Sequence, residues 1–237
     1  MATRPADLIM ASEALRACRL FASLDEPTFA MLAEALRVRR FRRGEVVFHA
    51  GDPGEALFVV ATGSVKILLP ADDGTESAIL TTIGPGGFFG ELALLDGAPR
   101  SASAIALGPV ESFVLHRDSF DRLVDEQPTL RRALLAALAG EIRRLTSQVE
   151  DLHFLDLPGR LARHLLRRVT EAAGDAPPGP VRLAWPFTQA ELAGMIGGSR
   201  QSVNRLLADF VDRGLLLFDG DTLVVPDPAA LAEATRR

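Results

Sequence analysis

The hydrophobic positions divide the chain into stretches of different periodicity. Between residues 11 and 37 they recur at helical spacing, interrupted around Asp25-Glu26-Pro27, which predicts short amphipathic helices. The positions that carry this pattern are Leu15, Leu20, Phe21, Leu24, Phe29, Leu32 and Leu36. From Val38 to Leu115 the pattern changes to short β-type runs at 46–48, 56–61, 64–69, 77–82, 105–106 and 112–115. Turn clusters at 50–54 and 72–74 separate these runs, so the stretch predicts a β-barrel or jelly roll.

A third stretch, residues 128–156, has the pattern of one long helix with two seven-residue apolar series. The series are Leu138, Leu145, Leu152 and Leu135, Ile142, Val149. A seven-residue repeat keeps one narrow seam facing a partner helix, as in a coiled coil. We therefore expect this helix to pair with the same helix of a second copy and form a homodimer; the alternative is that the seam packs on the chain's own barrel.

The segment Asp156-Leu157-Pro158-Gly159 interrupts that periodicity. Asp is a good N-cap and Pro fits the first turn of a new helix, so a helix is expected over 159–173. We interpret the four residues as a hinge at a domain boundary. The expected domains are 11–127, 128–156 and 157–237.

The C-terminal stretch has the pattern of a helix-turn-helix. Thr188-Gln189-Ala190-Glu191 is a capping box that opens a helix through Ile196, and Gly197-Gly198 makes a tight turn. Ser199 then caps a second helix that runs to about Arg213. The runs 215–218 and 222–225, joined by Asp219-Gly220, predict a hairpin that would act as a wing.

Polar side chains of the second helix suit the edges of DNA bases. Arg200, Gln201, Asn204 and Arg205 share one flank, while Val203, Leu206 and Leu207 face inward. Arginine pairs well with guanine and amides with adenine in the major groove. We expect phosphate contacts from Ser199, Ser202, Thr188 and Gln189.

A cassette in the middle of the chain, residues 89–102, combines a Gly-Glu pair with an Arg-Ser pair ten positions later. Glu91 can accept hydrogen bonds from ribose hydroxyls, and Arg100 can bind a phosphate through two parallel bonds. A short turn that starts at Gly90 can point backbone N–H groups at the same anion. The cassette predicts a cyclic-nucleotide pocket.

Composition and charge narrow the class of protein. The net charge of −5 does not exclude DNA binding, because residues 157–237 hold ten arginines against nine acidic residues. Cys18, the single cysteine, cannot form an internal disulfide, and no leader or long apolar run is present, so we expect a cytoplasmic protein without a membrane segment. The four histidines match no metal-site spacing and no catalytic constellation is recognisable, so no metal and no enzyme activity are expected.

Together these features resemble the CRP/FNR superfamily of bacterial transcription regulators, from about Leu20 to Pro226. The residues that carry the resemblance are the glycines Gly44, Gly51 and Gly63, the 89–101 cassette, the hinge 154–160 and the segment 187–216. It implies an α+β chain: an N-terminal β-barrel or jelly-roll cyclic-nucleotide-binding domain, a long dimerisation helix and a C-terminal winged helix-turn-helix domain.

The resemblance also implies roles for residues. Glu91 would contact the ribose 2′-hydroxyl, and Arg100 and Ser101 would bind the cyclic phosphate with the backbone of Gly90, Leu92 and Ala93. The dimer helix would close over the base, with Leu145 and Thr146 in register with the Thr-Ser pair of cAMP-responsive members. The implied partners are palindromic double-stranded DNA, a second copy of the chain and RNA polymerase.

Departures from the family pattern leave alternatives open. Leu145 stands in the threonine position, and Ser101 could bond a guanine amino group, so cAMP is the expected ligand and cGMP the alternative. Gln201 replaces the common glutamate of the recognition helix, so a DNA half-site that differs from the usual one is expected. Two other functions also fit: a regulator that needs no nucleotide or senses another effector, such as a haem-bound gas, and a cyclic-nucleotide-binding regulatory module of an enzyme.

Overall fold

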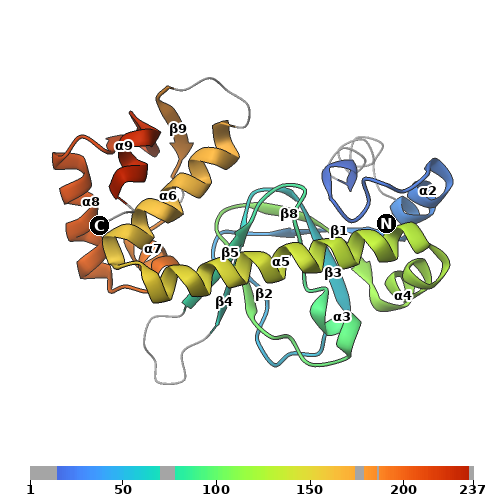
Figure 1. Ribbon diagram of the computed structural model, residues 1–237. Helices are drawn as coiled ribbons and strands as arrows, with labels where there is room; N and C mark the ends of the chain where they lie inside the picture. The colour runs from blue at the N-terminus through green and yellow to red at the C-terminus, as the bar shows by residue number, and fades with distance from the viewer. Residues whose placement is uncertain (1–14, 70–77, 174–178, 186, 235–237) are drawn as a thin grey trace. The chain divides into compact units, whose positions relative to one another are not determined.

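The computed structural model describes residues 15–69, 78–173, 179–185 and 187–234, and the chain forms two compact units. The first runs to Arg143 and the second begins at Arg144, so the long helix α5 (Pro128–Phe154) contributes to both. Figure 1 shows α5 as one continuous long helix.

The first unit is built on two antiparallel four-stranded sheets. One has the order β1-β8-β3-β6 and the other β2-β7-β4-β5. The strands are β1 (Arg37–Phe41), β2 (Val46–Phe48), β3 (Ala56–Thr62), β4 (Val65–Leu69), β5 (Ala78–Ile83), β6 (Phe88–Phe89), β7 (Ser103–Ala106) and β8 (Val110–His116). Its complete helices are α2 (Glu26–Ala35), α3 (Leu92–Asp96) and α4 (Arg117–Glu126).

Alternation along the central strands gives the first sheet two buried faces. Leu57 and Val59 of β3 join a core with α2, α4 and the first turns of α5, whereas Phe58 and Val60 face the second sheet. Both faces are apolar, because each is covered by another layer. This core also includes Leu94 of the short helix α3, which follows β6.

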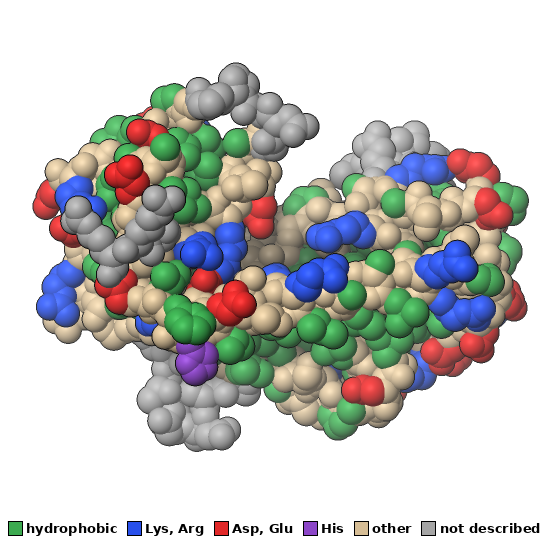
Figure 2. Space-filling view, in the orientation of Figure 1, with side chains coloured by type: hydrophobic (Ala, Val, Ile, Leu, Met, Phe, Trp, Pro, Cys, Tyr) green, Lys and Arg blue, Asp and Glu red, His purple; other side chains and the backbone are tan. Residues whose placement is uncertain are grey.

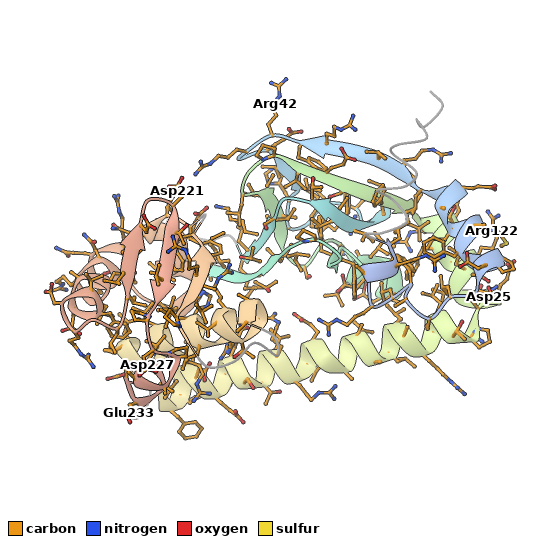
Figure 3. All side chains as sticks on the ribbon, turned by 90° about the horizontal axis from the view of Figure 1, so that it is seen from above. Asp25, Arg42, Arg122, Asp221, Asp227 and Glu233 are labelled. Atoms are coloured by element: carbon orange, nitrogen blue, oxygen red, sulfur yellow. The ribbon has the colours of Figure 1, made fainter. Side chains whose placement is uncertain are left out.

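The second unit packs helices against a small sheet of order β10-β11-β9. Its elements are α6 (Leu157–Ala173), β9 (Val181–Ala184), α7 (Gln189–Ile196), α8 (Arg200–Asp212), β10 (Leu217–Asp219), β11 (Thr222–Val225) and α9 (Pro228–Glu233). Apolar faces of all four helices meet in one core with Leu183 and Leu223. Asp227 caps α9 by accepting from the Ala229 N–H at 2.8 Å (Figure 3).

The predicted mix of helices and sheets is present, with some differences at element ends. The pattern did not predict β1, β6, β9, α4 or α9. The two apolar residues of β1, Val38 and Phe41, lie three positions apart, and β9 has only four residues, so neither strand shows a clear period of two. The long helix ends at Phe154, two residues before the predicted end. The expected turn at 72–74, Ser77 of the expected strand 77–82 and most of the loop 174–180 lie outside the described residues.

Two absences concern only the described part of the chain. None of its helices combines the length and apolar character that crossing a membrane requires. Within the same residues, no cluster of three or more His, Cys, Asp or Glu side chains is arranged to hold a metal ion.

Candidate functional site

The cassette forms a tight loop between β6 and β7. Gly90 has φ +85°, and a Cβ there would stand 2.6 Å from Arg100 Nη1 and 3.2 Å from the Ala56 carbonyl oxygen. Both the backbone conformation and the space therefore require glycine. Glu91 then occupies the N-cap position of α3 without a side-chain capping bond, and Gly97 ends the helix at φ +70°. The predicted turn that starts at Gly90 is confirmed.

Arg100 is buried at the centre of the cassette, with 6% of its surface exposed. Its Nη1 donates to the Gly90 carbonyl at 2.6 Å and its Nη2 to the Ala56 carbonyl at 2.8 Å. The guanidinium lies 4.2 Å from the centre of the Phe48 ring. The Nε–H is buried without a hydrogen-bond partner among the described residues. A buried cation with an unused donor suits an anionic ligand.

The backbone around Arg100 is fixed by the neighbouring loop. The Arg100 N–H donates to the Asp52 carbonyl at 2.9 Å, and the Arg100 carbonyl accepts from the Gly51 N–H at 2.8 Å. Sequence reasoning named Gly51 as a barrel glycine but did not connect it to Arg100. Every residue has a backbone carbonyl, so the sequence alone does not show which carbonyl oxygens accept hydrogen bonds from Arg100.

Glu91 lies partly buried beside this cation. Burial raises the pKa of its carboxyl, a hydrogen bond from its own backbone N–H opposes the rise, Glu141 adds to it and Arg100 counteracts it. For Arg100, burial lowers the pKa and the Glu91 carboxylate opposes that change. The structure thus brings the two predicted side chains, Glu91 and Arg100, into one charged site, and it adds Glu141 of α5, which sequence reasoning did not single out.

The other predicted ligand residues are placed as follows. Ala93 is buried, whereas Leu92 and Ser101 are exposed at the edge of the cassette. Leu145 and Thr146 lie on α5 in the second unit, both exposed. Their contact with a nucleotide stays a prediction.

The helix-turn-helix is formed by α7 and α8. Thr188 and Glu191 make the predicted capping box, Gly197 turns at φ +68°, and Ser199 caps α8 by accepting from the Ser202 N–H at 3.2 Å. A Cβ at Gly198 would stand 2.8 Å from Leu157, so glycine lets the turn approach α6. Val203, Leu207 and Phe210 bury the inner face of α8, as the pattern predicts for the first two.

The outer flank of α8 is polar and exposed. Arg200, Gln201, Asn204 and Arg205 are all exposed, and Asn204 Oδ1 accepts from Gln189 Nε2 at 2.9 Å. The Ser199 and Ser202 hydroxyls lie 2.9 Å apart. Side chains of these types can bind base edges and phosphates. Their contacts with DNA remain predicted.

Polar bonds fix the bend between α5 and α6. Asp156 Oδ1 accepts from the Gly159 N–H at 2.8 Å, and Arg160 Nε donates to the Ile196 carbonyl at 2.7 Å. One turn earlier, the buried Asp151 pairs with Arg167 and, at 3.4 Å, with Arg163. These last pairs were not predicted, because partners twelve and sixteen residues apart meet only once the bend angle is known. The role of 156–159 as a moving hinge stays a prediction.

Comparison with known proteins finds a matching family for each half of the chain. Residues 38–127 match the family described as "Cyclic nucleotide-binding domain", and residues 159–234 match the "Crp-like helix-turn-helix domain". A CRP-like cAMP-activated global transcriptional regulator from Mycobacterium tuberculosis is 35% identical over 224 residues, which cover 94% of this chain and 99% of the relative.

Solved structures agree on the fold. FixK2 from Bradyrhizobium japonicum superimposes with a TM-score of 0.75 at 23% identity, covering 84% of this chain and 96% of that one. The c-di-GMP responsive global regulator CLP of Xanthomonas campestris gives a TM-score of 0.71 at 27% identity, with 85% and 99% covered. The first likeness, at its low identity, concerns the fold alone.

Proposed function

The chain belongs to the CRP/FNR family of transcription regulators, and from that premise we propose that it is a homodimer that binds palindromic operators in response to a cyclic nucleotide. The relatives and the two matched domains indicate a transcription regulator with a DNA-binding helix-turn-helix, not an enzyme. For the ligand we propose cAMP first and cGMP second. The proposed partners are operator DNA, a second copy of the chain and RNA polymerase.

The observation that carries the ligand proposal is the state of Arg100. Its two terminal nitrogens are held by the carbonyls of Gly90 and Ala56, which fixes the guanidinium, while its buried Nε–H lacks a partner among the described residues. A phosphodiester beside it would satisfy that donor and neutralise a buried charge. We further propose that the Glu91 carboxylate accepts hydrogen bonds from ribose hydroxyls.

The dimer proposal rests on the surface of α5. Along this helix, large apolar side chains are exposed at heptad spacing: Leu135 (66%), Ile142 (65%) and Val149 (53%) in one series, Leu145 (40%) and Leu152 (56%) in the other. Figure 2 shows hydrophobic side chains gathered along the band that α5 occupies in Figure 1. A second α5 would bury these five side chains in one seam, whereas Leu138 of the same pattern already packs against the chain's own core.

The mechanism we propose is a two-state switch. Nucleotide bound at Arg100 and Glu91 favours the state in which the two α8 helices stand about 34 Å apart and enter successive major grooves. The ligand acts only as far as it binds that state more tightly, and couplings of about 1–3 kcal/mol raise DNA affinity about 5- to 150-fold. The bend at 156–159 would transmit the change.

The test uses DNA sites selected by the purified protein from random sequence. Fluorescence anisotropy gives the Kd for the selected site with and without cAMP or cGMP, at fixed salt. We expect one nucleotide to tighten binding at least fivefold in the wild type. Arg100→Ala should lose that response, and Arg205→Ala should lose specific DNA affinity while it retains nucleotide binding. The proposal is contradicted if Arg100→Ala loses specific DNA affinity and Arg205→Ala loses the response to nucleotide. It is also contradicted if the wild type binds DNA equally well with and without either nucleotide.

A further inference from the structure

A hydrogen bond joins the side chains of Gln189 in α7 and Asn204 in α8. Gln189 Nε2 donates to Asn204 Oδ1 at 2.9 Å, across 15 positions of the chain. Asn204 lies on the exposed polar flank of α8 that we expect to read bases, and Gln189 is half-buried. The bond therefore links the first helix of the helix-turn-helix to a predicted base-reading position of the second.

The backbones on both sides of this bond are held by the core of the second unit. Gln189 is the first residue of α7, directly after a complete capping box. Three positions further on, Leu192 is fully buried. Asn204 directly follows Val203, which is fully buried in the same core. Packing thus sets the separation of α7 and α8, and the hydrogen bond spans that separation at the edge of the core.

The bond fixes which end of the Asn204 amide faces away from α7. A planar amide holds its oxygen and its NH₂ group in different directions from Cγ, so an oxygen that accepts from Gln189 turns Nδ2 away from that residue. Gln189 stands at the N-terminus of α7, where the helix dipole is positive and favours an oxygen over an NH₂ group. Asn204 therefore offers two hydrogen-bond donors on the exposed flank of α8.

This bond contributes little to stability, because it lies at the surface, where water can replace either partner. Its effect is to hold in advance an orientation that a free asparagine side chain would adopt only on binding, at a cost in entropy. We propose that Gln189 is a positioning residue that orients Asn204 to read a base edge with hydrogen-bond acceptors, guanine or thymine. The inference rests on the proposed operator binding and adds to it a determinant of sequence specificity.

The major-groove edges of the bases explain this choice. Guanine presents acceptors at N7 and O6, and thymine presents one at O4, whereas cytosine presents the N4 donor. Adenine presents one acceptor and one donor, which suits an asparagine that uses both its oxygen and its NH₂ group. Because Gln189 already engages the oxygen of Asn204, the two donors of Nδ2 dominate the contact with DNA.

The test begins with selection of binding sites from random DNA by the full-length protein, with cAMP, with cGMP and with neither. Comparison of the wild type with Asn204→Ala identifies the operator position that Asn204 reads. Fluorescence anisotropy then gives the Kd for each of the four bases at that position. Circular dichroism verifies that every variant is folded.

Two substitutions of Gln189 separate the positioning role from other roles. Gln189→Ala removes the bond, and Gln189→Glu places a carboxylate there that can only accept, so that Asn204 must turn its Nδ2 towards α7. Ala190→Glu is the matched control, because it adds the same charge at the next position of the same helix.

For the wild type and Ala190→Glu we expect guanine or thymine at the Asn204 position, although the added charge of the control weakens binding to every sequence. Gln189→Ala should lower this preference, measured as a ratio of Kd values, by about three- to tenfold, with an unchanged midpoint of urea unfolding. In Gln189→Glu the amide is reversed and Oδ1 faces the DNA. The preference should then move to adenine or cytosine, which present donors.

The inference is overturned by adenine or cytosine at that position in the wild type, by an unchanged preference in either Gln189 variant, or by an operator in which Asn204→Ala alters no position. An equal loss of affinity for all sequences in Gln189→Ala also overturns it and assigns Gln189 to a phosphate contact. In each of these cases the wild type still selects an operator, and the proposed function stands. Enrichment of no sequence by the wild type under any of the three conditions refutes both.

Discussion

Substitution of Gly90 by alanine measures how strongly the cassette depends on its geometry. A residue with a side chain pays about 1–2 kcal/mol to adopt the left-handed conformation that Gly90 holds at φ +85°. The added Cβ would also stand 2.6 Å from Arg100 Nη1, so the guanidinium must move and weaken its bonds to the carbonyls of Gly90 and Ala56. Hydrogen bonds of a charged group contribute about 1.5–3 kcal/mol each.

With the backbone strain and the equivalent of one lost hydrogen bond, the expected loss for Gly90→Ala is about 2.5–5 kcal/mol in the free energy of unfolding. Gly97→Ala is the matched control, because Gly97 has φ +70° but a Cβ there would meet nothing within 4 Å. The control should cost about 1–2 kcal/mol, from backbone strain alone. The reduced entropy of the unfolded chain is the same in both variants and cancels.

Urea denaturation of both variants gives the two free energies, and calorimetric titration gives nucleotide affinity. Gly90→Ala should lose nucleotide affinity at least tenfold, whereas Gly97→Ala should bind within about threefold of the wild type. Equal destabilisation by the two substitutions, within about 0.5 kcal/mol, would refute the argument that Gly90 is required by its closeness to Arg100.

Three further predictions concern the rest of the chain. Arg205→Ala should weaken binding to a selected operator by about 1–3 kcal/mol, measured by fluorescence anisotropy, and should affect binding to random DNA much less. An equal loss of affinity for both DNAs would mean that Arg205 contacts a phosphate and does not read a base. Ile142→Glu, which places a charge on the 65% exposed seam of α5, should shift the protein to monomers in sedimentation velocity, and an unchanged dimer would contradict the seam. Burial lowers the pKa of His164 to about 4, so as the pH falls the unfolded chain takes up a proton at a higher pH than the folded chain does. The free energy of unfolding should therefore fall by up to about 3 kcal/mol between pH 6.5 and 4. A His164→Gln variant with the same pH profile of stability would contradict this.

The sequence predicted the elements whose signal is local. The capping box at Thr188, the turn at Gly197 and the seven-residue series of α5 depend on residues close in the chain, and the structure contains each of them. The pattern also predicted the pairing of Glu91 and Arg100 in one site, because both follow from the short cassette. Short sequence patterns were sufficient wherever the interacting residues are close together in the chain.

What the sequence did not predict depends on distant segments. Ala56 binds Arg100 through a carbonyl oxygen 44 positions away, and Asp151 meets Arg167 across a bend whose angle no short pattern defines. Glu141, whose charge raises the pKa of Glu91, lies 50 positions after that residue in the chain. Such contacts appear only when packing has set the distances between elements.

The most direct test of the central claim is calorimetric titration of the purified wild-type protein with cAMP and with cGMP, repeated on Arg100→Ala and on Arg205→Ala. We expect micromolar or tighter binding of one nucleotide by the wild type and by Arg205→Ala, and loss of that binding in Arg100→Ala. Circular dichroism of each variant verifies that it is folded, and Ser101→Ala replaces Arg100→Ala if that variant is not. Absence of heat with both nucleotides, or binding that survives the loss of Arg100, would contradict the claim that this chain is a nucleotide-switched regulator.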